Sequence, residues 1–181
     1  MPHTDKIRLW NGVLFLHSGV YKKAVFKFKI EFPTSYPKEV PRITFITDVF
    51  HPLVRIEDRE LDLGPFYKDT PKNKHGIINV LKFVKNMFLM NSYMKIETSF
   101  NPKAGKLFNT DYEKFKTKAA DSAGASYERK MQNSDNFVIK FSEFDTVHEK
   151  ILNNLKERNE ESLQSKVKGF KNWLERAWDD L

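Results

Sequence analysis

The 181 residues of this sequence include no cysteine. Disulfide bonds, thiolate metal ligands and covalent intermediates on a thiol are therefore excluded for these residues. Long apolar runs are missing as well, because no stretch approaches the roughly 18 to 20 residues that cross a bilayer, and the start MPHTDKIRLW lacks the apolar core of a signal peptide. We therefore expect a cytoplasmic or nuclear protein.

The motifs of common catalytic and metal sites are missing too. There is no Gly-rich phosphate loop and no Gly-flanked Ser. The five histidines form no i, i+4 pair and no cluster with acidic residues at metal-ligand spacing, so we predict no metal and no cofactor. Asp58, Glu60 and Asp62 lie close together, as in a cation site or a solvated loop, and we favour the solvated loop.

The charge is positive, with 31 Lys and Arg against 24 Asp and Glu, which gives a formal net charge of +7. The basic residues are spread along the predicted strands and helices, as is typical of solvated faces. Two denser groups are compatible with contact to nucleic acid or an anionic membrane, but neither has an aromatic stacking platform, so no nucleic-acid partner is expected. They are Lys22, Lys23, Lys27 and Lys29, and Lys103, Lys106, Lys114, Lys116 and Lys118.

Three segments near the start have the pattern of β-strands. In residues 24–32 (AVFKFKIEF), Phe and Ile alternate with charged residues, which predicts a strand with one apolar face and one face in water. Residues 8–16 and 42–46 are predicted to be two further strands. The connections are short, so we predict an antiparallel meander. The apolar side, expected to face the helices, consists of Phe26, Phe28, Ile30 and Phe32.

Helical patterns follow the strands. Gly76 precedes a stretch of apolar residues at helical spacing, which predicts a helix of about three turns. The segments TDYE from Thr110 and TVHE from Thr146 are capping boxes that should start two further helices. Strands first and helices afterwards indicate an α+β fold. The apolar positions of the first helix are Ile77, Leu81, Val84 and Phe88.

Several of these segments resemble a known family. The prolines around Tyr36 in FPTSYPKEVPRITF are similar to the strand-to-turn signature of ubiquitin-conjugating enzymes, and HPL at 51–53 resembles the His-Pro-Asn triplet of that family. The resemblance covers roughly residues 7–130 and implies an antiparallel meander sheet packed on helices. Family domains usually begin with a helix before the first strand, whereas only nine residues precede Trp10. Either the sequence is a truncated product or the N-terminal helix is missing, which would leave apolar sheet surface open.

At two positions the sequence differs from the family in residues that the family's catalytic reaction requires. The family's Asn after His-Pro supports the oxyanion, and Leu53 stands in its place without a donor. The family's nucleophilic Cys lies ten positions beyond the His, and 51 + 10 lands on Leu61. The resemblance therefore implies an inactive variant, with His51, Pro52, Leu53 and Leu61 as its degenerate active-site positions. We expect His51 to be a structural turn residue that bonds to the backbone.

The segments FHPLV, ELDL, NPKAGKLFNTDYEKFKTKAADS and FSEFDTVHEK narrow the resemblance to one branch of these inactive variants. That branch implies an adaptor or scaffold subunit that acts with Hook-type coiled-coil proteins and an FHIP-type subunit in dynein-linked vesicle and endosome transport. Membrane association would be indirect, and ubiquitin and a kinase are further candidate partners. The alternative is a ubiquitin-binding cofactor that assists an active conjugating enzyme.

The length suits one domain plus a tail, and we place the family-like domain at residues 1–132 and a helical extension at 133–181. Apolar residues of the tail are spaced 4, 3, 4, 3 and 4 apart from Leu163 to Leu181, the a/d pattern of a helix that packs against another helix. Docking of a partner helix and folding back onto the domain both remain open. The candidate partner-binding residues are Leu163, Val167, Phe170, Trp173, Leu174, Trp178 and Leu181.

Overall fold

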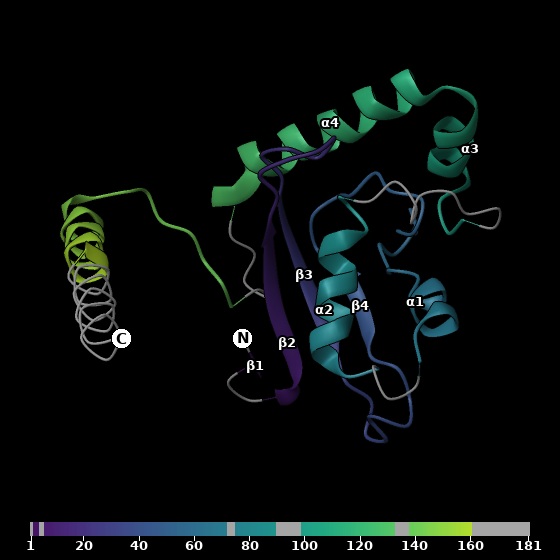
Figure 1. Cartoon of the computed structure of the whole chain (residues 1–181), viewed down its shortest axis with the longest axis horizontal. Helices are drawn as coiled ribbons and strands as arrows, with labels where there is room; N and C mark the ends of the chain where they lie inside the picture. The colour runs from purple at the N-terminus through teal and green to yellow at the C-terminus, as the bar shows by residue number, and fades with distance from the viewer. Residues whose placement is uncertain (1, 4–5, 72–74, 90–98, 133–137, 161–181) are drawn as a thin grey trace, which may run out of the picture. The chain divides into compact units, whose positions relative to one another are not determined.

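The computed structural model describes residues 2–3, 6–71, 75–89, 99–132 and 138–160 (Figure 1). The chain divides into two compact units, Met1–Phe141 and Ser142–Leu181. The first unit combines an antiparallel sheet with helices, and residues 146–160 of the second unit are helical. This is the predicted α+β class.

The sheet has four strands in the order β1-β2-β3-β4, with every neighbouring pair antiparallel. The strands are β1 (Pro2–His3), β2 (Lys6–Phe15), β3 (Val25–Glu31) and β4 (Arg42–Phe45). The predicted meander is therefore confirmed, and the predicted strand ranges differ from the observed ones only at their ends. Among the described residues before Trp10, 2–3 belong to β1 and 6–9 to β2.

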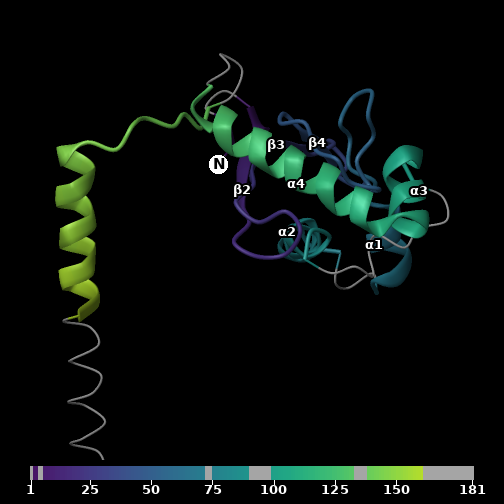
Figure 2. The same cartoon turned by 90° about the horizontal axis from the view of Figure 1, so that it is seen from above.

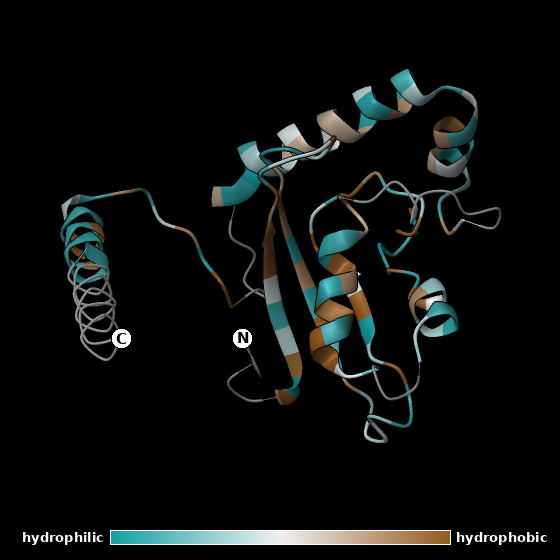
Figure 3. Ribbon diagram, in the orientation of Figure 1, coloured by the Kyte–Doolittle hydropathy of each residue, from teal (hydrophilic) through white to brown (hydrophobic). Residues whose placement is uncertain are grey.

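The helices follow the sheet in the chain. They are α1 (Gly64–Asp69), α2 (Ile77–Asn86), α3 (Pro102–Thr110), α4 (Tyr112–Glu128) and the 3-10 turn η3 (Arg129–Met131). Figures 1 and 2 show α2 lying over one face of the sheet, while α4 runs across the ends of the strands. Coloured by hydropathy, α2 turns its apolar residues toward the strands (Figure 3).

The apolar side of β3 packs in the core, as predicted. Phe26, Phe28 and Ile30 are buried, and Phe26 lies 5.1 Å from Phe88, centroid to centroid. Phe28 packs 5.9 Å from the ring of Phe45 on β4. α2 covers this face of the sheet, whereas α4 lies only at the ends of the strands. The expectation that both helices cover the face is therefore right for α2 alone.

Gly12 on β2 pairs with Phe28 and leaves room for its ring. A Cβ atom at position 12 would overlap the Phe28 ring atoms. Phe28 therefore lies across the neighbouring strand at the one place where that strand has no side chain.

Lys27 shows that the second face of β3 is not simply exposed to water. Lys27 is only 5% exposed, and its Nζ donates to the carbonyls of Lys130 at 2.9 Å and Gln132 at 3.0 Å. The Phe141 ring lies 5.1 Å from the same Nζ. The prediction that Lys27 faces water is therefore wrong. Carbonyls at the end of a helix lack intrahelical donors, and a long Lys side chain can reach them while burying its stem.

The start of α2 at Ile77 after Gly76 is confirmed. Of its four predicted apolar positions, Val84 and Phe88 are buried and Ile77 packs partly buried against the core, whereas Leu81 is exposed. The buried positions follow the spacing i, i+3, i+4, i+7, i+8, one stripe of an α-helix. They are Val80, Phe83, Val84, Met87 and Phe88.

Both predicted capping boxes lie within one residue of the observed caps. Asp111, not Thr110, caps α4 by accepting a hydrogen bond from the Lys114 N–H at 3.1 Å, and Thr110 ends α3. Asp145, not Thr146, accepts from the N–H groups of Val147 and His148. A carboxylate is a strong acceptor that also interacts favourably with the helix dipole, so the Asp beside each Thr takes the capping role.

Replacing Phe28 by Ala tests the register of β3. Because Phe28 is buried against Phe45 and over Gly12, the substitution should lower the free energy of unfolding by about 3 to 5 kcal/mol. The half-exposed neighbour Lys29 is the control, and its change to Ala should cost less than about 0.5 kcal/mol. Urea unfolding measures both, and equal losses at the two positions would contradict the register.

Candidate functional site

The positions predicted to be a degenerate active site lie in or directly before one hairpin. Val54 and Leu61 form an antiparallel bridge, and the Leu53 carbonyl accepts from the Asp62 N–H at 2.8 Å. The Leu61 N–H donates to the Ile43 carbonyl at 2.9 Å, which attaches the hairpin to β4. The fold therefore brings Leu53 and Leu61 together although they are separated in the sequence.

Both leucines belong to the hydrophobic core. Leu53 is 0% exposed and Leu61 is 3% exposed, and both are part of the core cluster that includes the strands and α2. A Leu side chain has no donor for an oxyanion and no atom that can hold an acyl group. The hairpin is therefore a packed structural element, and its degenerate positions present no reactive group to solvent.

His51 is held entirely by backbone groups. The Leu53 N–H donates to Nδ1 at 3.0 Å, so the proton of the neutral ring is on Nε2, which donates to the Met87 carbonyl at 3.0 Å. Burial lowers the pKa of His51 to about 4, although the hydrogen bond to Met87 acts in the opposite direction. The ring also packs against Phe88 and Tyr21. His51 has the structural role expected for it.

Pro52 links the hairpin to α3. Its carbonyl accepts from the Asn101 N–H at 3.0 Å, and the buried Asn101 side chain caps α3 by accepting from the Ala104 N–H at 3.0 Å. The NPKAG segment noted in the sequence is thus a helix start fixed to the degenerate site.

Two acidic residues of the hairpin, Asp58 and Glu60, are paired with arginines. Arg42 contacts Glu60 at 2.8 Å and Arg55 contacts Asp58 at 3.1 Å. A hydrogen bond from the Glu60 N–H, with Arg55 and Arg42 nearby, lowers the pKa of Asp58. Within the described ranges, no group of three or more His, Asp or Glu residues could hold a metal ion. Asp58 and Glu60 thus take part in an ion-pair network with Arg42 and Arg55.

The candidate tail residues 163–181 lie outside the described residues, so the docking and fold-back alternatives both stay predictions. The helix at residues 146–160 carries exposed apolar side chains at Val147, Ile151 and Leu155. Across the described part of the chain, no helix has the length and apolar character to span a bilayer.

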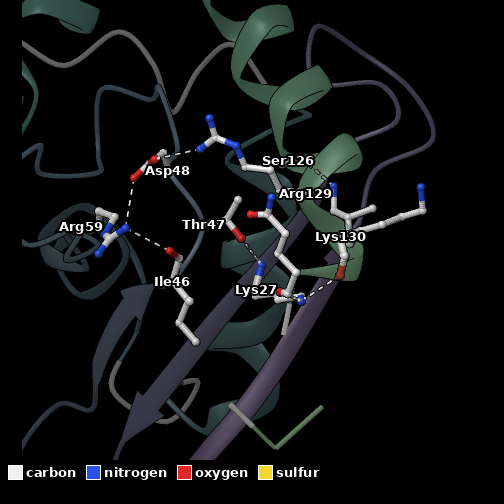
Figure 4. Close-up of a pocket in the computed structure, with 10 residues that line it drawn as sticks. Lys27, Ile46, Thr47, Asp48, Arg59, Ser126, Arg129 and Lys130 are labelled. Atoms are coloured by element: carbon white, nitrogen blue, oxygen red, sulfur yellow. Dashed lines mark hydrogen bonds and ion pairs between the residues drawn. The ribbon is translucent and has the colours of Figure 1, made fainter. Parts of the chain in front are cut away.

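Sequence reasoning missed one cluster. Asp48 lies between Arg59 and Arg129 at a pocket beside the end of α4 (Figure 4). These residues are far apart in the sequence and belong to no motif, so only the tertiary structure could reveal that they meet.

Comparison with known proteins establishes the class of this protein. The ubiquitin-conjugating enzyme family matches residues 1–123, and the chain belongs to this family. It does so without the cysteine on which the family's thioester chemistry depends.

Within this class the chain is similar to AKT-interacting proteins. It is 32% identical over 184 residues to the Homo sapiens protein, which covers 96% of this chain and 61% of that protein. AKT-interacting protein homolog A of Xenopus laevis is 32% identical over 190 residues, with the same coverage of 96% and 61%. Protein crossbronx-like of Drosophila mojavensis is 38% identical over 90 residues, 49% of this chain and 35% of that protein. The chain thus spans about three fifths of the length of the AKT-interacting proteins.

The buried His51 should make the stability depend on pH. Its folded pKa of about 4 lies below the unfolded value of 6.5, so protonation favours the unfolded chain. The contribution is fully present above pH 6.5 and is lost as the pH falls toward 4, in total about 3 kcal/mol. NMR should show that the His51 ring does not titrate between pH 7 and pH 5.

A matched pair of variants separates His51 from other titrating groups. Between pH 7 and pH 4.5 the free energy of unfolding should fall less in His51→Gln than in the parent, while His17→Gln, at an exposed position, should follow the parent. A His51 ring that titrates near pH 6.5 would show that it is not buried as described.

Proposed function

We propose that this protein is a catalytically inactive ubiquitin-conjugating-enzyme variant that serves as an adaptor or scaffold subunit. The observation that carries the proposal is the burial of Leu53 and Leu61 at the degenerate active-site positions, where the family requires an exposed donor and a nucleophile. The similarity to AKT-interacting proteins supports protein partners, because their name describes binding to another protein.

The finer proposal concerns the partners. The sequence resembles the branch of FTS, or AKT-interacting protein, and on that basis we infer Hook-type coiled-coil and FHIP-type subunits and a role in dynein-linked vesicle transport in the cytoplasm. In this proposal the domain at residues 1–132 is the scaffold, the extension at 133–181 offers the helix-binding stripe, and membranes are reached through partners. The predicted a/d pattern supports the role of the extension.

The chemistry can be tested directly. Incubation with ubiquitin-activating enzyme, ubiquitin and ATP should give no reducible ubiquitin adduct, because the chain has no thiol. Leu61→Cys should also fail, since position 61 is buried and Leu53 supplies no oxyanion donor. Non-reducing gels report the adduct, and an active conjugating enzyme in the same reaction is the control.

A folded Leu61→Cys variant that forms a thioester would contradict the proposal. Circular dichroism and the melting temperature establish that the variant is folded before activity is assayed.

The tail stripe is tested by a double substitution. Phe170→Asp with Leu174→Asp would bury charge in a helix interface and should abolish co-purification of the Hook-type coiled-coil partner, while the melting temperature stays unchanged. Ser165→Asp with Asn172→Asp adds the same charge away from the a/d positions and should leave binding intact.

The same variants distinguish partner binding by the tail stripe from folding of the stripe back onto the domain. If the stripe folds back onto the domain, the melting temperature of the isolated protein should fall by several degrees, because a loss of 1 kcal/mol shifts a protein of this size by roughly 2 to 4 °C. Retained partner binding with an unchanged melting temperature would remove the tail from the proposal. Stimulated chain synthesis by an active conjugating enzyme would favour the cofactor function instead.

A further inference from the structure

A pocket with charged and apolar lining residues lies between the start of β3, the residues after β4 and the end of α4. Its volume is about 320 Å³, and its lining includes the cationic residues Lys27, Arg59 and Arg129. Asp48 is the one acidic residue among the ten described residues that line it. Figure 4 shows the side chains of Arg59 and Arg129 directed toward Asp48 from opposite sides. Arg59 belongs to the hairpin that contains Leu61, whereas Asp48 and Arg129 lie outside that hairpin.

Asp48 places one carboxylate oxygen against each arginine. Arg59 Nη1 lies 3.0 Å from Oδ1, and Arg129 Nη1 lies 3.7 Å from Oδ2. The Asp48 side chain is 74% exposed and that of Arg129 is 60% exposed. Ion pairs with this much solvent contribute little to stability, so an external anion can replace the Asp48 carboxylate at small cost.

Arg59 is held in place independently of Asp48. Its Nη1 also donates to the Ile46 carbonyl at 3.0 Å, and its backbone has a φ of 60°, in the left-handed region that non-Gly residues rarely adopt. A guanidinium fixed by a backbone contact loses less conformational freedom when it binds an anion.

The base of the pocket is polar as well. The Lys27 N–H donates to Thr47 Oγ1 at 3.0 Å, and the Ser126 hydroxyl accepts from the Val25 N–H at 3.0 Å. The Lys130 side chain contributes no charge here, because its Nζ lies 3.5 Å from the centroid of the Tyr127 ring and points away from the pocket. The two arginines are therefore the groups that would recognise a ligand.

We propose that this pocket binds a phosphorylated side chain of a protein partner, with the phosphoryl group replacing the Asp48 carboxylate between Arg59 and Arg129. A phosphoryl group carries a charge of about −1.5 to −2 and three acceptor oxygens, so it competes for both guanidinium groups better than a carboxylate does. A volume of about 320 Å³ is enough for one such side chain. A membrane surface is less suitable, because anionic lipids are recognised by clusters of about four to eight Lys and Arg residues.

The proposal does not depend on which partner the adaptor binds, and it is tested on the full purified chain. Three short peptides serve as probes, identical except for a central phosphoserine, Ser or Glu. In ¹⁵N–¹H NMR titrations the phosphoserine peptide should shift the backbone amides of Asp48, Arg59 and Arg129, and the Ser and Glu peptides should bind at least about tenfold more weakly.

Two substitutions in the pocket should act in opposite directions. Arg129→Gln removes a ligand contact and should weaken phosphoserine-peptide binding at least about tenfold. Asp48→Asn removes the competing carboxylate and should strengthen it severalfold, an effect that a merely structural Asp48 would not produce. Arg42→Gln removes an exposed, ion-paired arginine outside the pocket and should leave the affinity unchanged.

Other outcomes overturn the proposal. These are absence of the pocket shifts, binding that survives Arg129→Gln in a folded variant, weaker binding in Asp48→Asn, and equal binding of the Ser or Glu peptide. Inorganic phosphate that binds as tightly as the phosphopeptide would indicate a free-anion site. Vesicles of phosphatidylcholine with phosphatidylinositol 4-phosphate that bind more tightly than the phosphopeptide would indicate a membrane site. None of these results affects the adaptor proposal, which rests on the degenerate site and the tail.

Discussion

The two hydrogen bonds of the His51 ring connect the hairpin of the degenerate site to the rest of the core. One bond goes to the Met87 carbonyl directly after α2, and the other comes from the Leu53 N–H within the hairpin. Because the ring is fully buried, a charged imidazole would lack water, and the neutral ring is the form that satisfies both backbone groups. The position of the hairpin relative to α2 therefore depends on an uncharged His51.

This arrangement explains how the hairpin keeps its structure although Leu53 and Leu61 carry no catalytic group. His51 holds the turn, Pro52 receives a hydrogen bond from the start of α3, and Leu53 and Leu61 fill the core between them. Each of these residues stabilises the fold, so the hairpin does not need to react to be retained. Function in such a domain is expected at surfaces, and the described surface offers a pocket with a convergent pair of arginines.

Local patterns allowed most of the fold to be predicted. The alternation in β3 identified its buried side, because side chains of a strand point to opposite faces. The same pattern could not identify what covers the other face, and Lys27 is buried because η3 and Phe141 pack over it. For α2, the helical spacing was recognised in the sequence, but which side of the helix packs on the sheet depends on the tertiary structure. Leu81 lies on the outer side.

The sequence by itself determined that no thiol chemistry occurs in these residues, since the absence of Cys is a matter of composition and no folding can change it. It also indicated β2, β3, β4, α2 and α4 in their order, because their periodicities and caps are local, but it did not indicate β1, α1 or α3. Only the tertiary structure decided that Leu53 and Leu61 are buried and that Asp48 meets Arg59 and Arg129. The burial of a side chain and the meeting of charged groups depend on contacts between segments that are distant in the chain. Such contacts produce no regular residue spacing that could be recognised in a single sequence.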